Sequence, residues 1–105
     1  MAWLMLFVAG LFEVVWAVAM KQSAGFTRLW PSVVTLVGMV ASFVLLSAAM
    51  RTIPLGTAYT IWTGIGAVGA FVVGFTVLGE QVNLMRVVAA VLIVSGLVLM
   101  KMAGD

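Results

Sequence analysis

The residue types that perform most protein chemistry are scarce in this chain of 105 residues, which contains no histidine and no cysteine. Without them the chain cannot form disulfides, the usual zinc sites, thiol chemistry or histidine-based acid–base catalysis. Glu13 is the one acidic residue inside a long apolar segment. A buried carboxylate is costly unless a bound proton or a bound cation neutralises it. Glu13 is therefore the first candidate for a functional group.

The neighbours of Glu13 on a helix support this choice. Residues three and four positions apart share a helix face, so Gly10, Trp16 and Ala17 line up with Glu13. Gly10 leaves space, and the indole N–H of Trp16 is a candidate donor to the carboxylate. Two alternatives stay open: a permanently protonated Glu13 that bonds to a neighbouring helix, and a Trp16 that only packs.

Polar and aromatic side chains in two later apolar segments extend the candidate site. Ser42, with Met39 one turn before it, either donates to Glu13 from a facing helix or bonds to its own helix carbonyl. Tyr59 and Trp62 share one helix face, and Thr63 is beside them. One carboxylate with several aromatic faces is typical of a site for an organic cation.

The elements that must position these residues are membrane-spanning helices. The chain is 66% hydrophobic and 8% charged, whereas soluble domains contain about 25% charged residues. A spanning helix needs about 20 mostly apolar residues, and charges and turn residues divide the chain into four such pieces. The sequence predicts an all-α protein with four transmembrane helices in one domain over residues 1–105. The expected spans are 2–20, 32–50, 57–78 and 84–101.

Two details of these spans are predicted as well. Asn83 precedes the fourth span and is suited to cap a helix. Gly64, Gly66 and Gly69 lie close together in the third span, where they either form a hinge or allow close helix packing. At about 1.5 Å per residue, Glu13 lies about 17 Å along the first helix and hence near the middle of the bilayer.

The loop charges hardly favour either orientation in the membrane. Arg51, Lys101 and the amino terminus fall on one side, and Lys21, Arg28 and Arg86 fall on the other. The positive-inside rule therefore allows a single orientation, set by another signal, or insertion in both orientations, which permits an antiparallel dimer. With no basic cluster, nucleic-acid binding is not expected. No enzymatic nucleophile–base pair, metal cluster or cofactor motif is visible either.

Several longer motifs resemble the small multidrug resistance family of proton-coupled exporters. They are Glu13 in the first helix, the segment 25–32 (GFTRLWPS), and the segment from Pro54 to Gly66, with its TAY and IWTGIG runs. The segment 13–17 (EVVWA) is similar to the guanidinium exporter subtype. The multidrug subtype typically has Gly in place of Trp16 and an aromatic residue in place of Met39.

The resemblance implies an antiparallel, dual-topology homodimer in the bacterial inner membrane that exports guanidinium in exchange for protons. Glu13 would bind either protons or the cation, Trp16 and Ser42 would orient it by hydrogen bonds, and Tyr59 and Trp62 would line the pocket. Three alternatives remain: a wider exporter of quaternary ammonium cations, a cation channel, and a membrane subunit that transports nothing.

Overall fold

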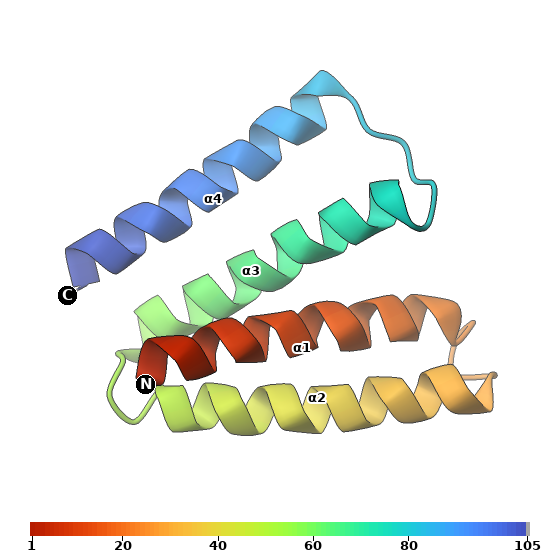
Figure 1. Ribbon diagram of the computed structural model, residues 1–105, viewed down its shortest axis with the longest axis horizontal. Coiled ribbons are helices and arrows are strands. Elements are labelled where there is room, and N and C mark those ends of the chain that lie inside the picture. Colours follow the sequence, from red (N-terminus) through yellow and green to blue (C-terminus); the bar gives the residue numbers. More distant parts are fainter. Residues whose placement is uncertain (105) are drawn as a thin grey trace.

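The computed structural model describes residues 1–104, and these form four long helices with no strand among them. They are α1 (Ala2–Gln22), α2 (Leu29–Ala49), α3 (Leu55–Thr76) and α4 (Leu84–Gly104) (Figure 1). A helix of 21 residues is about 31 Å long at 1.5 Å per residue, which matches the hydrocarbon core of a bilayer. All four helices are apolar and long enough to cross a membrane. The predicted all-α membrane architecture is confirmed.

The helix bounds differ from the expected spans by a few residues, for local reasons. Helix α2 begins at Leu29, before Ser32, so Pro31 lies in its first turn. Proline is tolerated there because the first N–H groups of a helix have no intrahelical acceptor. Helix α3 begins at Leu55, directly after Pro54. Proline fixes φ, here −57°, and lacks the N–H that a helix interior would need.

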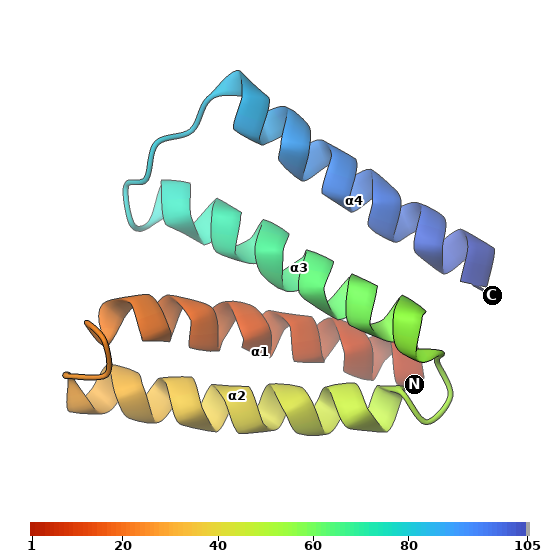
Figure 2. The ribbon, with the colours of Figure 1, turned by 180° about the vertical axis from the view of Figure 1, so that it is seen from behind.

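The helices pack in a spatial order that differs from their order in the chain. Helix α1 lies between α2 and α3, and α4 lies on the far side of α3 (Figures 1 and 2). The molecule is a slab of 42 × 34 × 17 Å. Its buried core joins the first three helices and comprises Leu6, Ala9, Leu46, Ala49, Ile53, Ala58, Ile61 and Trp62. Helix α1 is therefore the central element, in contact with both α2 and α3.

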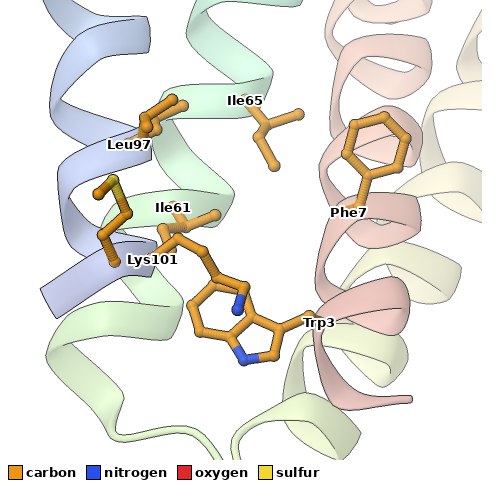
Figure 3. Close-up of a pocket in the computed structure, with 8 residues that line it drawn as sticks. Trp3, Phe7, Ile61, Ile65, Leu97 and Lys101 are labelled. Atoms are coloured by element: carbon orange, nitrogen blue, oxygen red, sulfur yellow. The ribbon is translucent and has the colours of Figure 1, made fainter. Parts of the chain in front are cut away.

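Helix α4 packs along α3 and has no buried residue in its described part. A crevice of about 280 Å³ separates it from α1 near the chain termini. Figure 3 shows Trp3 and Phe7 on one side of this crevice and Leu97 on the other. The Lys101 ammonium lies 4.6 Å from the centre of the Trp3 ring, which is a cation–π contact between α4 and α1.

The charged loops lie at the two ends of the helices as expected. Both termini are at the same end, together with the connection that carries Arg51 (Figure 1). The α1–α2 connection with Arg28 and the start of α4 with Arg86 are at the opposite end. In the folded chain, as in the sequence, the basic residues are thus divided almost equally between the two ends of the helix bundle.

The cap expected at the start of α4 is present. The Asn83 side-chain oxygen accepts the backbone N–H of Arg86 at 2.9 Å. This bond satisfies one of the first-turn N–H groups that the helix itself leaves unpaired.

We expect Asn83→Ala to lower the free energy of unfolding by about 1 kcal/mol, because the cap acceptor is lost. Asn83→Ser is the matched control, since a serine hydroxyl caps equally well. Thermal unfolding of the purified protein in detergent measures both. Equal losses in the two variants would show that the cap contributes nothing.

Candidate functional site

Glu13 lies close to the middle of α1, and its side chain is directed at α3. The carboxyl group rests on Gly66 so closely that a Cβ added at position 66 would overlap the Glu13 carboxyl carbon and Oε1. Oε1 is buried and has no hydrogen-bond partner among residues 1–104. A buried carboxyl oxygen without a donor is costly, so it is a ready acceptor for a proton or for a cation with N–H groups.

Trp16 lies one turn further along α1 but is directed at a different neighbour. Its Cβ packs at Gly38 of α2, and its ring meets Phe43 edge-on at a centroid distance of 6.3 Å. The indole N–H is buried and unbonded within the described chain. The hydrogen bond from Trp16 to Glu13 that the sequence suggested is therefore not formed. The physical reason is that Glu13 faces α3, whereas Trp16 is packed against α2.

Ser42 is buried on α2, but it does not bond to Glu13 as the resemblance implied. Its hydroxyl donates to the Ala9 carbonyl of α1 at 2.7 Å and accepts the Trp62 indole N–H at 2.9 Å. In a regular helix the Ala9 carbonyl also accepts the backbone N–H of Glu13, four residues on. Ser42 thus links α1, α2 and α3 one turn from the Glu13 carboxyl group. Its hydroxyl donates to α1 and not to a carbonyl of its own helix, which was the alternative left open by the sequence.

Four aromatic rings form a row across the first three helices. Phe43 lies between Trp16 and Trp62, with a centroid distance of 5.8 Å to Trp62. Tyr59 continues the row at 5.6 Å from Trp62. Phe43 was not among the residues predicted from the sequence, because a single Phe in an apolar span is ordinarily a packing residue. Its position directly after Ser42 was the available signal.

The remaining candidate residues, Gly10, Met39 and Thr63, lie on three different helices and do not form one cluster with Glu13. Gly10 allows α1 to approach Ile65 of α3, since an added Cβ would lie 2.5 Å from it. Met39 is half-buried on α2 next to Gly38. Thr63 lines a separate cleft of about 610 Å³ between α3 and α4 together with Tyr59. The structure therefore does not bring Thr63 to the carboxyl group of Glu13.

The three glycines in the middle of α3 each face a neighbouring helix. Gly64 faces Leu97 of α4, Gly66 faces Glu13, and Gly69 faces Val14. An added Cβ would collide in every case, and α3 runs as one uninterrupted helix through this region. This arrangement favours close packing over a hinge for these glycines.

The arrangement offers binding rather than bond-making chemistry. The described residues contain no group of three His, Cys, Asp or Glu side chains that could hold a metal ion. They do contain a carboxyl on a membrane-spanning helix with one buried, unpartnered oxygen, and a row of aromatic rings on the first three helices. Such a site suits a proton or an organic cation with an apolar or planar body.

Comparisons with known proteins agree with this interpretation. The family profile described as "Small Multidrug Resistance protein" matches residues 1–93. A protein of Yersinia pseudotuberculosis named "Guanidinium exporter" is 52% identical over 99% of this chain and 100% of its own length. Proteins with the same name from Escherichia coli and Salmonella typhimurium are 52% and 50% identical, each over 98% of both chains.

We expect Gly66→Ala to destabilise the protein by about 1–3 kcal/mol, because the added methyl group overlaps the Glu13 carboxyl. In a Glu13→Ala background the same change should cost much less, since the overlapping atoms are gone. Thermal unfolding of the purified variants measures both effects. Gly56→Ala is the control, because a Cβ at Gly56 meets nothing within 4 Å. An equal cost of Gly66→Ala in both backgrounds would contradict the contact.

Proposed function

The chain belongs to the small multidrug resistance family of membrane proteins, and on that premise we propose that it exports guanidinium in exchange for protons. The observation that carries the proposal is the half-buried Glu13 side chain, which lies near the middle of a membrane span and has one buried carboxyl oxygen that is unpartnered within the described chain. The names of the relatives support an exporter, and thus a transporter rather than an enzyme.

Guanidinium suits this carboxyl by shape and charge. The ion is planar and presents N–H donors in a fork that matches the two oxygens of a carboxylate. The rings of Phe43, Trp62 and Tyr59 supply aromatic surface near the same region, and a cation is attracted to the face of such a ring. The three relatives described above are named guanidinium exporters, which supports the same substrate class here.

We infer proton coupling because the proton and the guanidinium ion would bind to the same carboxyl group, that of Glu13. Glu13 in its charged form is unstable in the membrane interior unless a cation neutralises it, and in its protonated form it has no charge to hold that cation. Proton and guanidinium therefore compete for one group. A proton that enters from outside displaces the cation outward, and the reverse step reloads the site. Glu13 is the residue to which we assign both proton and substrate binding.

We assign the active unit to an antiparallel homodimer in the bacterial inner membrane. Four helices in a slab only 17 Å thick do not enclose a pathway with two alternating openings. The basic residues are almost equally divided between the two ends of the chain, so both insertions are similarly favourable. Each copy would bring one Glu13 to the shared site, which permits about two protons per cation.

A wider substrate range is the second candidate function. The exposed faces of Phe43 and Tyr59 are the observation that favours it, because quaternary ammonium ions have no N–H groups and rely on aromatic contact. Trp16 opposes it, since its indole occupies space one turn from Glu13. Competition of bulky quaternary cations with guanidinium uptake in vesicles would distinguish the wider range from the narrow one.

In proteoliposomes with an imposed pH gradient, we expect the protein to accumulate guanidinium against its own gradient, and Glu13→Gln to abolish accumulation. Glutamine keeps the size of the side chain but can neither release a proton nor hold a cation. Glu80→Gln removes an acid outside the four helices and serves as the control, with accumulation retained. Downhill movement alone would indicate a channel, and full activity of Glu13→Gln would indicate a role without transport.

We further expect tags on either terminus to be labelled from both sides of the membrane. A mixed population is the physical consequence of the balanced loop charges. Labelling intact cells and then permeabilised cells with an impermeant reagent measures the two fractions. Added lysines in the 23–28 connection should shift the population toward one side. Labelling of the unmodified chain from one side only would contradict dual insertion.

A further inference from the structure

Trp16 approaches α2 closely at Gly38, where an added side-chain carbon would make a tight contact. A Cβ added at Gly38 would lie 3.1 Å from the Trp16 Cβ, inside the optimum of about 3.5–4.0 Å between carbon atoms. The next nearest atoms, the Trp16 backbone N and Cα, would be 3.6 and 3.7 Å away, which is ordinary contact. The first side-chain carbon of Trp16 is therefore the atom that makes position 38 tight.

Packing alone holds the Trp16 ring in its place. The indole N–H has no hydrogen-bond partner among residues 1–104, so no polar contact fixes the ring within the described chain. The contacts that place it include the close approach at Gly38 and the edge-on contact with Phe43, both on α2, and Trp16 also packs against the buried core. A change at either contact moves the indole without breaking a hydrogen bond.

Helix α1 has little room to move away from α2, because its other side is closely packed on α3. Helix α1 lies between α2 and α3, and its α3 side is already closed by Glu13 on Gly66 and Val14 on Gly69 (Figure 2). An added methyl group at position 38 would therefore press on the Trp16 Cβ, and a shift of that residue would change the space around the α1 turn that also carries Glu13. The space lost there would matter more for a large cation than for a small one.

We infer that Gly38 is a specificity-determining residue that sets the size limit of the cation site by positioning Trp16. The inference rests on the proposed function, because the site must transport cations for a size limit to be expressed. Gly38 does not touch the Glu13 carboxyl, so it acts through the indole. Its role differs from that of Gly66, which lies directly against the carboxyl group.

The experiment compares guanidinium with phenylguanidinium, a cation that keeps the same fork of N–H donors and adds a ring. Transport of both is measured in proteoliposomes for the unmodified protein, Gly38→Ala, Trp16→Gly and the double variant. Gly38→Ala should lower kcat/KM for phenylguanidinium relative to guanidinium on the order of tenfold. In the Trp16→Gly background the same change should leave this ratio unaltered, because the Trp16 Cβ that it would push is absent.

Val37→Ile is the matched control, since it adds one carbon to the neighbouring residue of α2, whose side chain is 64% exposed. The control should leave the ratio unchanged. If Gly38→Ala or Trp16→Gly transports too weakly, thermal unfolding provides the second measurement. The cost of Gly38→Ala in stability should then be present when Trp16 is intact and absent in the Trp16→Gly background.

The outcomes separate this inference from the proposed function. Absence of guanidinium transport by the unmodified protein would overturn the proposed function, and with it the size limit. Guanidinium transport with equal losses for both cations in Gly38→Ala would overturn the inference alone. An equal ratio change with Trp16 intact and in the Trp16→Gly background would also overturn it, because Gly38 would then act independently of the indole.

Discussion

The arrangement of the helices depends on one physical constraint, which is the presence of an ionisable carboxyl group in the middle of an apolar helix. Such a group is stable in a membrane only if it is protonated, paired with a cation or directed at a protein interior. Glu13 is placed on the central helix, with its carboxyl against α3 rather than toward the open side of the slab. Gly66 of α3 leaves the room that this side chain occupies.

Glycines provide the room that this placement needs. Gly66 receives the Glu13 carboxyl, Gly69 receives Val14, and Gly38 receives the first carbon of Trp16. Without a hydrophobic driving force between helices in lipid, close approach of this kind is a main source of helix association. The same glycines that allow α1 to pack closely on both sides therefore also help to determine where the side chains of Glu13 and Trp16 lie.

Some polar groups in the interior are hydrogen-bonded and others are not. Ser42 uses its hydroxyl both as donor and as acceptor, so the buried Trp62 indole and the serine are satisfied. The Glu13 Oε1 and the Trp16 N–H have no partner among residues 1–104. Buried polar groups are usually paired, and each exception in a native structure calls for an explanation such as a functional role. The hydrogen bonds of Ser42 thus lie close to two polar groups that could still form a hydrogen bond, the Glu13 Oε1 and the Trp16 N–H. This supports our assignment of the cation site.

The sequence by itself determined the four membrane helices, the Asn83 cap and the candidate acid, because apolar length, capping chemistry and an isolated charge are local properties. It did not determine which helix each side chain would face. Ser42 bonds to the Ala9 carbonyl instead of Glu13, Trp16 packs on Gly38, and Phe43 completes the aromatic row. A helix that is apolar all round has no polar face to orient it. Only the fit of side chains into the glycine contacts of the folded bundle decides its rotation, and with it the partners of the site.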